Sequence, residues 1–216
     1  MTYLQLVNKV LIRLREDQVA AVNENFYSVL IGDFVSQALR EVENAWNWNA
    51  LRTTVQVNTV SGTYGYSLTD VGSGYKFYDV HEDTQDYDLR KASYEQMNHW
   101  LLSSPQTDLP QYYDVNGVDS DGDPVVNLYP IPDGAYTINF NMKVLTKLDD
   151  DLTGSTSIVV PWLPVQLRAL ELAVEERGDD QGLSLTFLQQ QFEKALGDAI
   201  AYDAALHADE LIWNEE

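Results

Sequence analysis

The spacing of apolar residues changes twice along the chain, and this change constrains the fold more than any single motif. Near the start, apolar side chains recur at intervals of three and four residues, which predicts an amphipathic helix with Thr2 as its N-cap. The residues of this stripe are Tyr3, Leu6, Val7, Val10, Leu11 and Leu14. Between Thr53 and Thr59 the interval becomes two, which is typical of a strand with one buried side. From Pro161 the helical interval returns.

Three further helices follow from the same helical spacing. One covers Leu30 to Trp46 and leads into an aromatic-rich stretch. Another begins at Pro161, with Gly178 as its C-cap candidate. The last runs from about Leu183 toward Trp213.

The middle of the chain predicts short strands separated by Gly, Asp and Pro residues. The pair Ser61-Gly62 is expected to turn the first strand into a second at Thr63 to Leu68. The remaining candidates are Tyr75 to His81, Asp88 to Ala92, Gln111 to Asn116, Val125 to Tyr129 and Ala135 to Val144. One helix, Tyr94 to Leu102, interrupts them and begins with a capping box formed by Ser93 and Gln96.

The order of helices, strands and helices predicts an α+β fold. Helices from both ends of the chain are expected to form one bundle, with an antiparallel β domain embedded between them. The predicted boundaries are 1–51 for the first helices, 52–157 for the β domain with its short helix, and 158–216 for the last helices and a terminal arm.

The stretch VVNLYPIPDGAYTINF, residues 125–140, predicts a hairpin with a stiff corner. Its two arms have strand-like residues, and Pro130, Pro132, Asp133 and Gly134 stand where the backbone must reverse. Proline fixes φ and removes an N–H donor, so this corner cannot extend a sheet. Such a stiff corner suits a part that is built into something larger, so these four residues are candidate interaction residues.

The charge of the chain limits its partners. Thirteen Lys and Arg residues stand against 34 Asp and Glu residues, which gives a net charge of −21, and the acids are spread along the whole sequence. Such a surface repels phosphate, so specific nucleic-acid binding is not expected. The expected partners are proteins, including proteins with basic faces. The first residues follow helical spacing and predict a mature end rather than a signal peptide, and no apolar run predicts a membrane span.

No motif predicts a cofactor, a metal site or a catalytic group. Residues 119–123, DSDGD, begin like a calcium loop, but Pro124 and Pro130 occupy the positions of its glycine and closing glutamate, so a hairpin turn is the better interpretation. The three histidines, His81, His99 and His207, lack metal-ligand spacing and are interpreted as surface or packing residues. Cysteine is absent, which excludes disulfides and thiolate sites.

Taken together, four stretches resemble the head-to-tail adaptor proteins of tailed bacteriophages, especially the tail tubular protein A type of short-tailed phages. They are NAWNWNALRTTVQV (44–57), PQYYDVNG (110–117), VVNLYPIPDGAYTINFNMKV (125–144) and IVVPWLPVQLRALELAVEERGDDQG (158–182). Each stretch alone is weak, and their order and spacing carry the resemblance, which covers nearly the whole chain.

The resemblance implies a structural virion protein rather than an enzyme, made in the bacterial host cytoplasm and placed in the phage neck. Twelve copies would form a ring that joins the portal protein to the tail nozzle, a protein of the tail tubular B type, and in some phages would hold tail fibres. DNA would pass through the ring during ejection, and an acidic wall would not grip it. The apolar residues Trp162, Leu211, Ile212 and Trp213 are further candidates for contacts within this assembly.

The residues by themselves are also compatible with two other functions. Paired carboxylates with 13 Tyr and 5 Trp residues could serve a glycan-binding module or a glycoside hydrolase, which would be a compact monomer. A helical interaction domain with an unidentified partner is the third interpretation.

Overall fold

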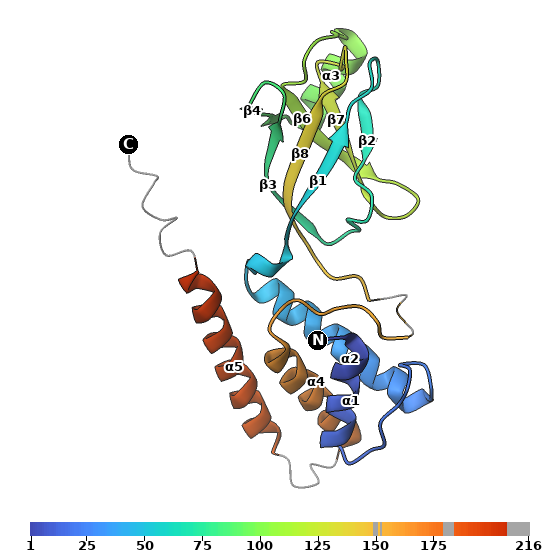
Figure 1. The fold of residues 1–216 in the computed structure, drawn as a ribbon, viewed down its shortest axis with the longest axis vertical. Helices are drawn as coiled ribbons and strands as arrows, with labels where there is room; N and C mark the ends of the chain where they lie inside the picture. Colours follow the sequence, from blue (N-terminus) through green and yellow to red (C-terminus); the bar gives the residue numbers. More distant parts are fainter. Residues whose placement is uncertain (149–150, 152, 179–183, 207–216) are drawn as a thin grey trace. The chain divides into compact units, whose positions relative to one another are not determined.

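Two chain segments far apart in the sequence fold together around a common core in the computed structural model, which describes residues 1–148, 151, 153–178 and 184–206 (Figure 1). They are Met1–Leu51 and Thr146–Glu216, and we call them together the helical unit. Its elements are α1 (Tyr3–Arg13), α2 (Phe26–Ala45), the 3₁₀ turn η1 (Asn49–Leu51), α4 (Trp162–Arg177) and α5 (Leu185–Ala205). Residues Arg52–Leu145 form a second unit, the β unit, so the α+β fold class is confirmed.

Capping residues fix where the first two helices begin. Thr2 and Gln5 form a reciprocal capping box at the start of α1, as the sequence predicts for Thr2. Asn25 and Ser28 form a second box and start α2 at Phe26, earlier than its apolar stripe indicates. The apolar spacing did not predict this first turn, because Phe26 is 86% exposed and does not belong to the buried side of the helix. No helix in the described part of the chain is long and apolar enough to cross a membrane.

Helix α4 is the centre of the helical unit. It contacts α1, α2 and α5, and Figure 1 shows it between α2 and α5. It is therefore buried on more than one side, with Val165, Ala169 and Leu170 fully inaccessible to solvent. Gly178 ends the helix in a left-handed conformation, φ 62°, which confirms the expected C-cap.

Two arginines of α4 connect it to the N-terminal segment. Arg168 donates from Nε and Nη2 to the Glu41 carboxylate on α2, at 2.6 and 3.3 Å. Arg177 donates to the Tyr27 hydroxyl at 2.8 Å and to Glu16 at 2.5 Å. Such forked contacts add directional specificity to the apolar packing of α4.

The loop before α4 contacts the first turn of α1. We call its residues 153–158 the return loop. Tyr3 N donates to Thr156 O at 2.9 Å and Leu4 N to Gly154 O at 3.0 Å, so two N–H groups that helix geometry leaves unpaired are satisfied. The Asp151 carboxylate shapes the loop by accepting from Gly154 N at 2.8 Å. The predicted boundary placed residues 146–157 in the β domain, whereas the carbonyls of Gly154 and Thr156 accept hydrogen bonds from α1 of the helical unit.

The β unit is a sandwich of two four-stranded sheets. Its elements are β1 (Arg52–Asn58), β2 (Gly65–Ser67), β3 (Tyr75–Glu82), β4 (Tyr87–Asp88), β5 (Arg90–Lys91), α3 (Tyr94–Ser103), β6 (Tyr112–Val118), β7 (Pro124–Tyr129) and β8 (Thr137–Val144). One sheet has the order β1-β8-β3-β4 and the other β2-β7-β6-β5. All strand pairs are antiparallel except the two-residue pair of β5 with β6.

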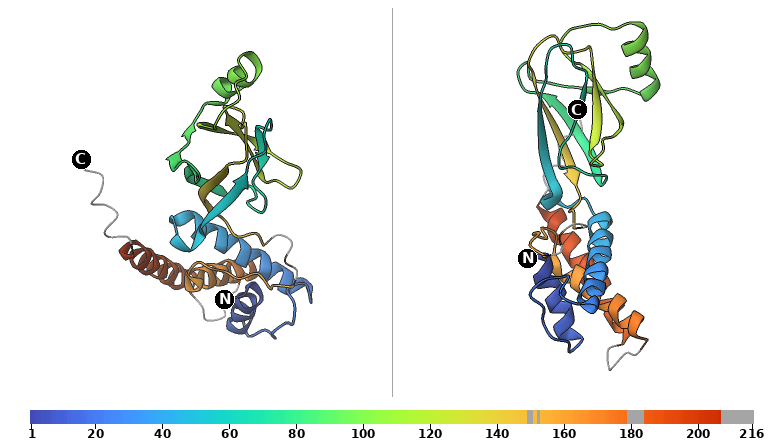
Figure 2. Two further views of the ribbon diagram at one scale, coloured as in Figure 1. Left: turned by 45° about the horizontal axis from the view of Figure 1, so that its top comes forward. Right: turned by 90° about the vertical axis from the view of Figure 1, so that its right-hand side faces the viewer.

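Both sheets bury their inner sides in one core. Val80, Ile138 and Phe140 of the first sheet pack with Val126 and Leu128 of the second. Helix α3 begins at Tyr94 with the predicted Ser93 as its N-cap, which accepts from Gln96 N, but the reciprocal half of the predicted capping box is not formed. The helix contacts β6 and β7 and lies at the outer side of one end of the second sheet (Figure 2, right). There Trp100 stacks on Tyr129 with ring centroids 4.9 Å apart.

The prediction of a hairpin at 125–140 is wrong. Strand β7 pairs with β2 and β6, whereas β8 pairs with β1 and β3, so the corner carries the chain from one sheet to the other. The physical reason is that both arms bury apolar side chains in the same core, which places them in facing sheets. The expected turn at Ser61-Gly62 is a crossing of the same kind, because β1 and β2 also lie in different sheets.

The glycine of the return loop offers a direct test of how α1 is held. Gly154 has φ +77°, and a Cβ there would lie 2.6 Å from Leu4 Cβ, whereas Gly178 has φ +62° and open space around it. Gly178→Ala should therefore lose about 1 kcal/mol of unfolding free energy from backbone strain alone. Gly154→Ala should lose about 3 kcal/mol, because overpacking against α1 adds to the strain. Urea unfolding followed by circular dichroism measures both, and equal losses would show that the return loop does not constrain α1.

Candidate functional site

The outer side of the sheet β1-β8-β3 carries polar side chains from three strands, and we call it the polar face. Strand residues alternate between the two sides of a sheet, so the inward Val55, Ile138 and Phe140 leave their neighbours facing outward. The outward residues are Arg52, Thr54, Gln56 and Asn58 of β1, Thr137, Asn139, Asn141 and Lys143 of β8, and Lys76, Asp79 and His81 of β3. An irregularity in the pairing between Phe77 and Asp79 interrupts the alternation on β3.

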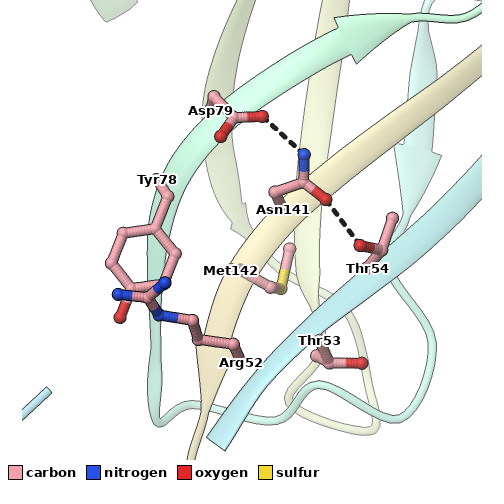
Figure 3. Close-up of a pocket in the computed structure, with 7 residues that line it drawn as sticks. All are labelled: Arg52, Thr53, Thr54, Tyr78, Asp79, Asn141 and Met142. Carbon is pink, nitrogen blue, oxygen red and sulfur yellow. Dashed lines mark hydrogen bonds between the residues drawn. The ribbon is translucent and has the colours of Figure 1, made fainter. Parts of the chain in front are cut away.

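Side-chain hydrogen bonds run across the strands of this face. Thr54 Oγ1 donates to Asn141 Oδ1 at 2.5 Å, and Asn141 Nδ2 donates to Asp79 Oδ1 at 2.5 Å (Figure 3). In the next row, Gln56 Nε2 donates to Asn139 Oδ1 at 3.1 Å. Each amide is oriented by a neighbour, so the face presents a fixed pattern of donors and acceptors.

Two adjoining depressions lie on the polar face, each with a volume of about 550 Å³. The first is lined by Arg52, Thr53, Thr54, Tyr78, Asp79, Asn141 and Met142 (Figure 3). The second shares Thr54, Asp79 and Asn141 and is completed by His81, Asp88 and Asn139. Tyr78 is the one aromatic side chain in either lining, so the aromatic platform that a glycan site would need is not assembled here.

The charges of the polar face are separated along β3. At one end, Arg52, Lys143 and Lys76 are direct neighbours in register, and we call these three residues the basic row. The Arg52 guanidinium and the Lys76 ammonium lie 5.3 and 5.9 Å from the centre of the Tyr78 ring. Both distances are within cation–π range.

The opposite end of β3 leads into an acidic turn, by which we mean Asp83, Asp86 and Asp88. His81 Nδ1 lies 3.0 Å from Asp88 Oδ1, and Nε2 lies 3.4 Å from Asp86 Oδ1. The hydrogen bond to Asp88 and the charges of all three aspartates raise the pKa of His81 above its usual 6.5, against the opposing effect of burial. His81 thus has a structural partner, and Asp79 and Asp88 are each engaged by a side chain of the same face.

The sequence-predicted site residues do not come together in one place. Pro130 and Pro132 are buried in the β unit, and Asp133 is exposed and accepts from the Tyr136 hydroxyl. Gly134 does not have a positive φ, so the corner does not require glycine there for its backbone conformation. The corner is held from both sides, since Gly62 N donates to Pro132 O at 2.8 Å and Thr59 Oγ1 to Gly134 O at 2.9 Å.

The remaining predicted residues belong to the helical unit. Trp162 is 39% exposed at the start of α4, and the Lys9 ammonium lies 4.3 Å from the centre of its ring. Leu211, Ile212 and Trp213 lie outside the described residues. Within Leu185–Ala205, Leu188 is the one buried residue of α5, so most of this helix faces solvent in the isolated chain.

The aspartates of 119–123 form a hairpin turn between β6 and β7, as the sequence analysis preferred. Asp119 Oδ1 accepts from Asp121 N at 2.9 Å and Asp123 N at 3.0 Å. Asp123 accepts from Asp70 N at 2.8 Å and so holds a second loop. Across the described residues, no group of three or more His, Asp or Glu side chains could hold a metal ion.

Sequence reasoning missed the polar face. The alternation in RTTVQVN, residues 52–58, places polar side chains on one side of β1 and was the available signal. It could not show that Arg52 lies beside Lys143 and Lys76, because those residues are 91 and 24 positions away and meet only through strand register.

Comparison with known proteins identifies one family for this chain. The family model described as SU10 adaptor protein matches residues 1–210, which includes both units. No curated protein matches the chain.

The contacts of His81 predict a measurable pH dependence. Because its pKa is raised in the folded state, His81 stabilises the fold at pH values below the unfolded pKa of about 6.5. This contribution is lost as the pH rises through the folded-state pKa. An NMR titration of the imidazole should give a midpoint above 6.5, and Asp88→Asn should lower it. A midpoint that is unchanged by Asp88→Asn would contradict the assigned contact.

Proposed function

Because this chain belongs to the SU10 adaptor protein family and is therefore a phage adaptor protein, we propose that it is a head-to-tail adaptor of the tail tubular protein A type. Twelve copies form a ring that joins the portal protein to the tail nozzle, and DNA passes through its channel. The adaptor acts by assembly, without catalysis and without a cofactor. The observation that carries the proposal is the family match over residues 1–210.

The charge of the chain supports the proposed channel. A net charge of −21 means that a wall built from many copies repels the phosphates of passing DNA. The same charge favours partners with basic surfaces, which suits docking between unlike virion proteins. A ring of identical copies also needs two different contact surfaces on each copy, because its contacts are head-to-tail.

Several exposed groups are proposed as contacts in this ring. In the β unit, Asp133 and Gly134 present the corner between the sheets, while Pro130 and Pro132 support it from inside. In the helical unit, Trp162 offers an exposed ring. The apolar Leu211, Ile212 and Trp213, within an acidic C-terminal stretch, are proposed to reach the portal or a neighbouring copy.

The test uses particles from a phage that lacks this gene and is complemented with plasmid-borne variants. Cryo-electron microscopy with the wild-type chain should show a twelvefold ring between portal and nozzle. Removal of all residues after Ala204 should reduce ring occupancy about tenfold or more, because apolar contacts are lost. The matched variant Leu211→Ser, Ile212→Ser, Trp213→Ser keeps the chain length and should behave like the truncation.

Three outcomes would contradict parts of the proposal. Normal particles without any density for this chain in the neck would contradict the adaptor position. A ring of another symmetry would contradict the twelve copies. Full occupancy of both C-terminal variants would contradict the proposed role of Leu211, Ile212 and Trp213.

A further inference from the structure

We propose that the polar face of the β unit is a contact surface between copies of this chain, with the basic row of one copy against the acidic turn of the next. The inference rests on the proposed ring, which requires contacts between identical copies. It identifies the two surfaces that meet, and the electrostatic reason that they do.

The basic row is unusual for this chain. Only 13 Lys and Arg residues exist beside 34 acids, yet Arg52, Lys143 and Lys76 are adjacent across three strands. Like charges directly opposite each other in a sheet are unfavourable for the isolated chain. Lys143 is buried and has an interaction of its own, so the contact is assigned to the exposed Arg52 and Lys76.

The acidic turn is held by backbone hydrogen bonds and is open to solvent. The carboxylates of Asp86 and Asp88 belong to side chains that are 94% and 76% exposed. Beneath them the buried Glu82 accepts hydrogen bonds from Thr84 N at 2.9 Å and Gln85 N at 2.6 Å, which fixes the turn. A preformed turn loses little conformational entropy when it binds.

The two charged ends cannot neutralise each other within one copy. Lys76 and Glu82 are six residues apart on β3, a separation of roughly 20 Å along an extended strand. This is more than twice the Debye length of about 8 Å at physiological ionic strength. Each end is therefore available to the oppositely charged end of another copy.

The proposed contact has the symmetry that a ring needs. The basic row and the acidic turn are different surfaces, so pairing them joins copies head-to-tail and leaves one free end of each kind for the next copy. The proposed partner of the basic row is thus a second copy of this chain. An acidic surface on another virion protein is the alternative that the test must exclude.

Charge reversal and its rescue test the proposal in the complementation system. Arg52→Glu with Lys76→Glu should lower ring occupancy about tenfold, because like charges would then meet at the contact. Asp86→Lys with Asp88→Lys should do the same. The chain that carries all four substitutions restores opposite charges at the contact and should recover most of the occupancy. Thermal melting of each purified variant checks that its fold is retained.

Arg90→Glu with Lys194→Glu is the matched control, because it makes the same change of net charge at exposed residues of β5 and α5, outside the polar face. This variant should assemble normally. Equal loss in the control would show a net-charge effect and overturn the proposal. Loss with Arg52→Glu and Lys76→Glu that the fourfold variant fails to rescue would show a partner other than a second copy, and would also overturn it.

A crosslinking experiment separates the inference from the proposed ring. The chain has no cysteine, so in a mixture of Arg52→Cys and Asp86→Cys chains only the introduced thiols react with a bifunctional thiol crosslinker, and mass spectrometry distinguishes the mixed pair from pairs of like chains. A crosslinked mixed pair, formed without a twelvefold ring in particles, would support the contact and contradict the ring. A twelvefold ring whose copies give no such pair would contradict the contact and leave the ring standing.

Discussion

The fold depends on the contact between the first turn of α1 and the return loop, because it closes the helical unit from two distant parts of the chain. Tyr3 N and Leu4 N donate to carbonyls of Thr156 and Gly154, and the buried stripe of α1 then packs in the helical unit, where α1 contacts α4 and α2. A second contact holds the chain where it re-enters the unit. The fully buried Glu43 accepts from Thr146 N at 3.1 Å, and Arg40 donates to Thr146 O at 3.1 Å.

The β unit is inserted between the two segments of the helical unit, and its first and last strands, β1 and β8, pair with each other from Arg52 and Lys143 onward. Its core is separate, so its outer surfaces are not needed to complete the helical unit. The polar face can therefore keep hydrogen-bonded rows and separated charges that a packed interior would not tolerate.

The local elements could be predicted from the sequence, whereas their pairing could not. Helical spacing and capping residues located α1, α3 and α4, since these signals act within a few residues. The stretch around Pro130 was misinterpreted because strands joined by a turn look alike in a hairpin and in a crossing between two sheets. The polar face was missed for a related reason, since Arg52 and Lys76 become neighbours only through Lys143 between them.

The central claim is that this closure joins α1 and α4 into one cooperative unit. Native-state hydrogen exchange tests it most directly. The account predicts that amides of Val10 in α1 and Leu170 in α4 exchange through the same opening, with equal free energies and equal dependence on denaturant. Protection in β8 should follow a separate opening, because its core belongs to the other unit. Exchange of Val10 through a smaller opening, while Leu170 stays protected, would show that α1 is peripheral and would contradict the account.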